Sequence, residues 1–128
     1  AVVGSSLGGF YATVVAEQIG CRAVLLNPAV DPARDLERYI GEVTAWHSDE
    51  CFDFRAEFVD ELRQMTPPAL TDHGRYLAII AKGDELLDWR ETSARHAGCH
   101  VKLLEGSDHA LSDFDRHLPD LLRFVGLA

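Results

Sequence analysis

Residues 1–10 read AVVGSSLGGF, an apolar run followed by a glycine-rich turn. Residues 10–19 continue with apolar side chains at helical spacing, so the sequence predicts a strand, a tight turn and a helix in that order. Gly4, Ser6 and Gly8 match the pattern G-x-S-x-G, in which a serine stands on a sharp turn between a strand and a helix. Small residues on both sides of the serine are expected to give this turn its room. The first amides of the helix would then point at the serine hydroxyl.

The rest of the chain continues this alternation. Further strands are predicted at 22–26, 75–81 and 100–104, and further helices at 32–40, 54–65, 89–97 and 114–127. Residues 44–53 are polar, with Trp46 and Phe52 among them. Such an alternation predicts an α/β fold with a parallel sheet flanked by helices. In sheets of this kind, functional groups gather at the carboxyl ends of the strands.

Three of the predicted strands end in residues suited to nucleophilic catalysis, namely Ser6, Asp84 and His109. A serine hydroxyl is a weak nucleophile until a base accepts its proton, and a histidine base needs an acceptor on its other ring nitrogen. We therefore expect Ser6 to be the nucleophile, His109 the base and Asp84 the acid. The N–H of Leu7 is expected to stabilise an oxyanion. The order Ser, Asp, His along the chain is that of α/β-hydrolases.

Other acids near these positions leave alternatives. Asp88 could replace Asp84 as the acid, although Asp84 lies closer to its strand end, and Asp88 also fits the N-cap of the helix predicted at 89–97. Asp108 is the sequence neighbour of His109 and is expected to point away from it. Asp113 is expected to cap the final helix.

The 128 residues carry 21 acidic and 12 basic side chains, a formal net charge of −9. This charge argues against binding to a nucleic-acid backbone or to an anionic lipid surface, both of which favour a basic face. No apolar run is long enough to span a membrane, and the three cysteines suggest no disulfide framework, so a cytoplasmic location is expected.

Two groups of potential metal ligands are interpreted as ordinary structure. His47, Asp49, Glu50 and Cys51 match no standard zinc spacing and are expected in a solvated loop. His96, Cys99 and His100 are expected as surface and strand residues. The sequence therefore predicts neither a metal nor an organic cofactor.

Four segments resemble the YqiA-type esterases, a small bacterial family of the α/β-hydrolase superfamily: VGSSLGGFYAT (3–13), NPAV (27–30), GDELLDWR (83–90) and GSDHA (106–110). They occur in the family's order and span the chain. The resemblance implies an esterase or thioesterase acting on acyl esters, with acyl-CoA as one candidate substrate. It maps Ser6 to the family's nucleophile, Asp84 to its acid and His109 to its base.

The resemblance also implies a truncation. Members of the family begin with a strand and a Leu-His-Gly-Phe-like loop upstream of the serine turn, and this loop would supply a second oxyanion amide. The chain is therefore expected to lack the N-terminal strands, to place the strand before Ser6 at an exposed sheet edge, and to be impaired in activity.

We expect residues 1–128 to form a single, partial α/β-hydrolase domain with a cap-like helical insertion around 42–70. Trp46, Phe54 and Phe58 could line an acyl pocket there. The alternative is a core-facing amphipathic helix with an apolar stripe, which the spacing of Phe54, Phe58, Val59, Leu62 and Met65 also fits.

The sequence thus predicts a serine esterase or thioesterase that hydrolyses a small-molecule acyl ester through an acyl-enzyme. Two alternatives stay open. One is a non-catalytic or impaired α/β-hydrolase fragment or binding module, and the other is an acyltransferase, in which an alcohol takes the place of water.

Overall fold

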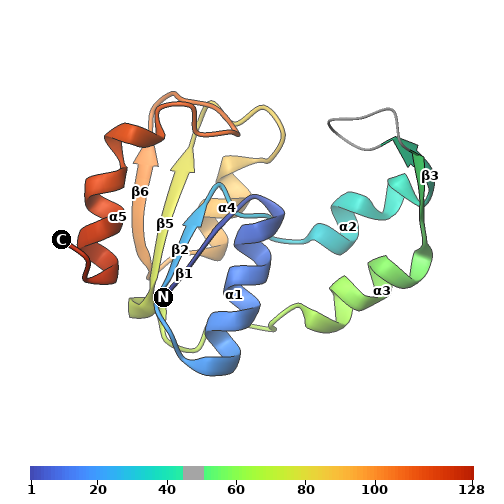
Figure 1. The fold of residues 1–128 in the computed structure, drawn as a ribbon, viewed down its shortest axis with the longest axis horizontal. Helices are drawn as coiled ribbons and strands as arrows, with labels where there is room; N and C mark the ends of the chain where they lie inside the picture. The colour runs from blue at the N-terminus through green and yellow to red at the C-terminus, as the bar shows by residue number, and fades with distance from the viewer. Residues whose placement is uncertain (45–50) are drawn as a thin grey trace. The chain divides into compact units, whose positions relative to one another are not determined.

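The computed structural model describes residues 1–44 and 51–128, and for 41–44 and 51–54 it describes the backbone alone. The described chain divides into two compact units, Ala1–Val30 with Pro67–Ala128, and Asp31–Thr66. The first unit contains a four-stranded parallel sheet in the order β1-β2-β5-β6 (Figure 1). Its strands are β1 (Val2–Ser5), β2 (Ala23–Leu26), β5 (Tyr76–Ala81) and β6 (His100–Leu104). The predicted parallel sheet is therefore confirmed.

Helices flank this sheet. They are α1 (Leu7–Ile19), α4 (Trp89–Arg95) and α5 (Leu118–Val125), with the 3-10 turns η2 (His73–Arg75) and η3 (Phe114–Arg116). Figure 1 shows α1 and α5 on opposite sides of the strands. The fold of the first unit is thus the α/β layer arrangement that the alternating pattern predicts.

The two central strands are buried on both faces, which explains their continuous apolar sequence. Successive side chains of a strand point to opposite faces, so one strand contributes side chains to two hydrophobic clusters, one on each face of the sheet. Leu25 packs in a cluster with Ala12 and Ala16 of α1. Its neighbour Val24 belongs to a second cluster, which Leu121 of α5 completes. The parallel sheet is therefore held by apolar contacts on each side.

Strand β1 lies at one end of the strand order and pairs with β2. Val3, in the middle of β1, is half exposed. The prediction that the strand before Ser6 lies at an edge is confirmed for the sheet formed by the described residues.

The second unit contains a short hairpin between helices. Its elements are α2 (Pro32–Leu36), the 3-10 turn η1 (Glu37–Tyr39), β3 (Gly41–Thr44), β4 (Cys51–Phe54) and α3 (Ala56–Met65). Strands β3 and β4 pair in antiparallel fashion, with Thr44 opposite Cys51. Of the residues predicted in a solvated loop, Cys51 instead begins β4, and the others lie outside the described residues. The β-branched residues and phenylalanines of these short strands favour extended structure once the strands pair. Helical spacing of apolar residues does not reveal this preference.

Two predicted helices end or break earlier than expected. Helix α2 ends at Leu36 instead of residue 40, and Gly41 begins β3. The final helix is divided into η3 and α5. Pro119 lies in the first turn of α5, and because proline has no N–H to continue a preceding helix, the helix restarts there.

The apolar stripe predicted on residues 54–65 is confirmed only in part. Val59 and Leu62 of α3 are buried, whereas Phe58 and Met65 are 40% and 37% exposed. Trp46 lies outside the described residues, as does the side chain of Phe54. The cap-like insertion around 42–70 stays a prediction.

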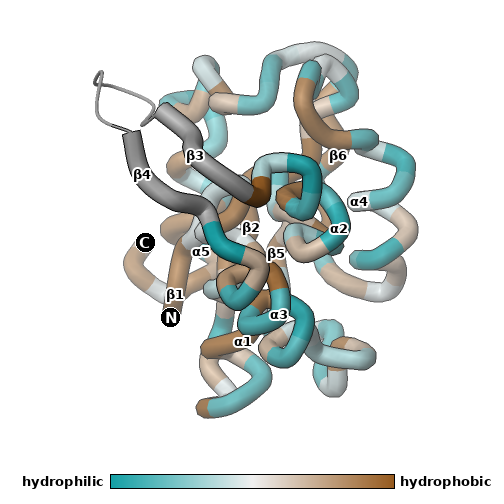
Figure 2. Tube along the Cα trace, turned by 90° about the vertical axis from the view of Figure 1, so that its right-hand side faces the viewer, coloured by the Kyte–Doolittle hydropathy of each residue, from teal (hydrophilic) through white to brown (hydrophobic). Residues whose placement is uncertain are grey.

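Hydropathy follows the layers. In Figure 2 the strands of the first unit contain the brown, hydrophobic segments, whereas teal predominates on α3. None of the helices in residues 1–44 and 51–128 combines the length and the apolar character that a membrane span requires.

The turn between β1 and α1 has room for a side chain at Gly8 but not at Gly4 or Gly9. A Cβ added to Gly4 would lie 2.0 Å from the carbonyl oxygen of Gly8, and one added to Gly9 would lie 2.7 Å from Cβ of Pro28. A Cβ added to Gly8 would meet nothing within 4 Å. The expectation that both glycines of G-x-S-x-G make room for the turn is therefore right for Gly4 and wrong for Gly8.

We expect opposite effects of the same substitution at these two glycines. Gly4→Ala forces strand and helix apart and should lower the free energy of unfolding by about 1–3 kcal/mol. Gly8→Ala adds a methyl group in open space within a helix and should raise it by about 0.5–1 kcal/mol. Urea unfolding followed by circular dichroism measures both, and equal effects of the two substitutions would contradict this account of the turn.

Candidate active site

Ser6 has the backbone conformation of a strained turn. Its φ is 55° and its ψ is −119°, between the end of β1 at Ser5 and the start of α1 at Leu7. The turn is held by backbone hydrogen bonds on both sides, since the Ser6 N–H donates to the Leu26 carbonyl at 2.9 Å and the Ala29 N–H donates to the Ser6 carbonyl at 2.9 Å. Such strain persists only where the surroundings impose it. The G-x-S-x-G prediction of a strand, a turn and a helix is confirmed.

The amino end of α1 lies directly beside this serine. The first amides of a helix have no acceptor within the helix, and the helix dipole makes this end partially positive. The first turn of α1 contains no acidic residue to offset that charge. No hydrogen bond found in the described part of the chain uses the Leu7 N–H. This amide can therefore donate to a negative oxygen formed next to Ser6.

His109 joins Ser6 to Asp84, although the three residues follow different strands. Its Nε2 lies 2.8 Å from Oγ of Ser6, and its Nδ1 lies 2.9 Å from Oδ2 of Asp84. A carboxylate oxygen can only accept a hydrogen bond, so Nδ1–H donates to Asp84 and Nε2 of the neutral ring accepts from the serine hydroxyl. The structure thus brings together the three side chains singled out from the sequence.

Asp84 is positioned by its own loop. Its side chain is only 3% exposed, and its Oδ1 accepts from the N–H groups of Leu86 and Leu87 at 2.8 and 2.9 Å. Asp88, the alternative acid, instead accepts from the Arg90 N–H at 3.0 Å and caps α4. The geometry therefore favours Asp84 as the partner of His109, and the N-cap predicted for Asp88 is confirmed.

The loops that follow β5 and β6 are held together by their backbones. The N–H groups of Lys82 and Gly83 donate to the carbonyls of Leu104 and Gly106 at 2.9 and 3.1 Å. A Cβ added to Gly83 would lie 2.1 Å from the Ser107 carbonyl oxygen, so the two loops touch at a point where only glycine fits. This contact fixes the Asp84 loop against the His109 loop.

The His109 loop has a second set of anchors on its far side. Leu111 is 2% exposed and packs in the core cluster beside α5. Asp113 accepts hydrogen bonds from the Ser107 hydroxyl and from the ring of His117, the latter at 2.9 Å. The Ser107 hydroxyl, followed by the His117 ring, lowers the pKa of the Asp113 carboxyl to about 2, so this acceptor stays ionised near neutral pH. Asp113 occupies the N-cap position of η3 as predicted, but its carboxylate makes no capping bond there and binds these two side chains instead.

The remaining candidate residues lie apart from this cluster or outside the description. Asp108 accepts from the N–H and hydroxyl of Ser112, in keeping with the expectation that it does not orient His109. His96 is 3% exposed, so its prediction as a surface residue is wrong. Burial lowers the pKa of its ring, and Nδ1 lies 2.7 Å from the Thr92 carbonyl.

His47, Asp49 and Glu50 lie outside the described residues, as does the side chain of Cys51. Among the side chains that are described, no three of the types His, Cys, Asp and Glu gather as a metal ion would require.

The sequence analysis missed the role of Asn27, which directly follows β2. Its side chain is 1% exposed and donates to the backbone of the His109 loop. Its φ is 42°, a value that asparagine tolerates better than most residues. An asparagine between a buried strand and a proline was the available signal, because a buried amide requires several hydrogen-bond partners.

Solved structures of named hydrolases and esterases share this architecture. Alpha/beta hydrolase domain-containing protein 10 from mouse matches with a TM-score of 0.66 and 20% identity, over 95% of this chain and 61% of that protein. The esterase domain of a Rhodothermus marinus protein matches with a TM-score of 0.65 and 20% identity, over 96% of this chain and 60% of that domain. At these identities the likeness shows the fold, which is that of the α/β-hydrolases.

Sequence relatives belong to one family. UPF0227 proteins of Yersinia pseudotuberculosis and Yersinia pestis are 24% identical over 127 residues, which is 98% of this chain and 64% of theirs. The chain thus spans less than two thirds of the length of the curated relatives it matches. The profile described as uncharacterised protein family UPF0227 matches residues 1–126. With its α/β-hydrolase fold, and in agreement with the resemblance to YqiA-type esterases, the chain belongs to the family UPF0227.

Proposed function

We propose that this protein is a serine hydrolase that cleaves carboxylic esters or thioesters through an acyl-enzyme. The observation that carries the proposal is the continuous hydrogen-bonded path from the Ser6 hydroxyl through the His109 ring to the Asp84 carboxylate. It begins at a serine held in a strained strand-to-helix turn. Each feature occurs in proteins of other functions, but together they meet the geometric requirements of nucleophilic catalysis at serine.

In the proposed first step, Nε2 of His109 takes the proton of Ser6 as the serine oxygen attacks the carbonyl carbon. The negative charge that develops on the carbonyl oxygen is stabilised by the Leu7 N–H at the positive end of α1. Asp84 accepts from Nδ1–H and so stabilises the imidazolium that forms. Collapse of the tetrahedral intermediate breaks the bond to the alcohol or thiol, which leaves with the proton held by His109.

In the second step a water molecule replaces the leaving group. His109 takes a proton from this water, whose oxygen attacks the acyl carbon. The second tetrahedral intermediate then breaks its bond to Ser6 Oγ, which takes the proton back from His109 as the carboxylic acid leaves. All groups invoked belong to the first unit of the chain. An ester or thioester substrate is favoured by the resemblance to YqiA-type esterases, and the esterase name of a structural neighbour agrees with it. Acyl-CoA is one candidate thioester.

Covalent labelling tests the nucleophile. We expect a fluorophosphonate probe to modify the wild-type protein at Ser6 and Ser6→Ala to abolish the labelling, because the probe reacts only with a serine activated by a base. Ser5→Ala is the matched control, since Ser5 is the adjacent, exposed serine of the same turn and makes none of the contacts described above. Intact-mass spectrometry and peptide mapping measure both. A folded wild-type protein that remains unlabelled would contradict the proposal in favour of a non-catalytic module.

A pair of acid substitutions tests the partner of His109. Asp84→Asn removes the acceptor that holds the proton on Nδ1, and we expect kcat for p-nitrophenyl acetate to fall by about 10⁴-fold. Asp88→Asn should change kcat by less than about threefold, because asparagine caps a helix as well as aspartate does. The reverse pattern in steady-state kinetics would assign the acid to Asp88.

A further inference from the structure

We propose that Asn27 is a positioning residue for the His109 base, holding the backbone of the base's loop against the strands that carry the other two members of the site. This inference rests on the proposed function, since it assigns a role in the same reaction. Asn27 touches none of the reacting atoms and acts through His109.

The side-chain amide of Asn27 makes three hydrogen bonds, one through each of its two N–H groups and one through its oxygen. Its Nδ2 donates to the carbonyl of Asp108 at 2.9 Å and to that of His109 at 3.0 Å. Its Oδ1 accepts from the N–H of Ala81 at 2.8 Å. The partners fix the orientation of the amide, because two carbonyls can only accept and a backbone N–H can only donate. No other uncharged side chain of this length offers two donors and an acceptor.

The same short segment also contacts the nucleophile. The Ala29 N–H, two residues beyond Asn27, donates to the Ser6 carbonyl at 2.9 Å, and the Asn27 N–H donates to the Ile79 carbonyl at 2.9 Å. The loop after β2 therefore contacts the Ser6 turn, the strand that precedes Asp84, and the His109 loop.

These contacts bear directly on the imidazole. The His109 N–H donates to the Glu85 carboxylate at 3.1 Å, and the His109 carbonyl accepts from Asn27. The backbone is thus held on both sides of the Cα that carries the ring. Without the Asn27 donor, the His109 carbonyl loses its bond to the loop after β2, and the position of Nε2 relative to Ser6 Oγ is less well defined. A displacement of about 1 Å at a reacting group can cost about 100-fold in rate.

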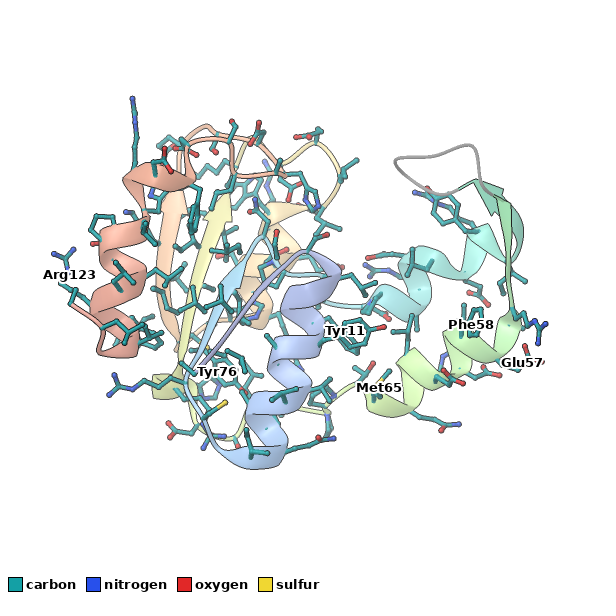
Figure 3. The ribbon with its side chains drawn as sticks, viewed as in Figure 1. Tyr11, Glu57, Phe58, Met65, Tyr76 and Arg123 are labelled. Atoms are coloured by element: carbon teal, nitrogen blue, oxygen red, sulfur yellow. The ribbon has the colours of Figure 1, made fainter. Side chains whose placement is uncertain are left out.

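Two variants separate this role from a general contribution to the fold. Asn27→Asp preserves the shape and the acceptor for Ala81 but removes both donors to the His109 loop. Asn27→Gly removes the side chain and keeps a residue that tolerates the φ of 42°. Tyr76→Phe is the control, because Tyr76 is fully buried in the same sheet and its hydroxyl bonds to Glu17. It lies where β5 begins, at the opposite end of the strand from Ala81 (Figure 3).

Three readouts are measured on each protein: kcat and KM for p-nitrophenyl acetate, the rate of fluorophosphonate labelling at Ser6, and the low-field proton resonance of His109 Nδ1–H. For the Asn27 variants we expect kcat and the labelling rate to fall by about 100-fold, KM to change by less than about threefold, and the resonance to broaden or disappear. Tyr76→Phe should retain the kcat and the resonance of the wild type even if its urea midpoint falls.

A folded Asn27→Gly or Asn27→Asp protein with wild-type kcat and an unchanged resonance would overturn the inference. Loss of the fold in both variants would overturn it as well, because Asn27 would then belong to the scaffold. A wild-type protein that neither hydrolyses the ester nor reacts with the probe contradicts the proposed function alone. In that case the resonance still reports whether Asn27 positions the ring.

Discussion

The parallel pairing of β1, β2, β5 and β6 is the constraint on which the candidate site depends. In a parallel sheet the carboxyl ends of all strands lie on the same side. Ser6, Asp84 and His109, which follow three of these strands, therefore meet although 103 residues separate the first from the last. The pairing itself is imposed by apolar burial, because β2 and β5 are covered on both faces and alternate residues feed separate cores. The site is therefore a consequence of sheet register more than of local sequence.

Backbone strain is concentrated in the loops at the carboxyl ends of these strands. The non-glycine residues with positive φ among those described are Ser6, Asn27, Ser107 and Leu111, and all of them lie in the loops that form or support the site. Each such conformation costs on the order of 1–3 kcal/mol and needs compensation from its surroundings. The compensation is visible for Leu111, which is buried in the core, and for Ser107, whose hydroxyl binds an ionised carboxylate. The core thus stabilises a geometry that the loops alone would not adopt.

Features with a local signal were predictable from the sequence. The strand-turn-helix at Ser6 and the helix cap at Asp88 depend on neighbouring residues, and the pattern of glycines, apolar spacing and a capping carboxylate predicts both. The asparagine before Pro28 indicated a buried, hydrogen-bonded amide, but its partners were not predictable, because they lie at the end of β5 and in the loop after β6. The same is true of Asp113, which has the residue type and position of a helix cap but binds Ser107 and His117 once the loop closes. The hairpin of β3 and β4 was missed because each strand is short and is stabilised by pairing with the other.

The choice between two chemically identical acids shows how little the residue type decides. Asp84 and Asp88 each accept hydrogen bonds from nearby backbone N–H groups, so each is held by its own loop. They differ in the partner of the second carboxylate oxygen. The bonds to Asp84 from Leu86 and Leu87 all use Oδ1, which leaves Oδ2 directed at the His109 ring. Because a carboxylate in that position can only accept, it determines which nitrogen of the ring carries the proton and hence which one is free to accept from Ser6. The backbone around Asp84 thus determines which ring nitrogen carries the proton in a histidine that lies 25 residues further along the chain.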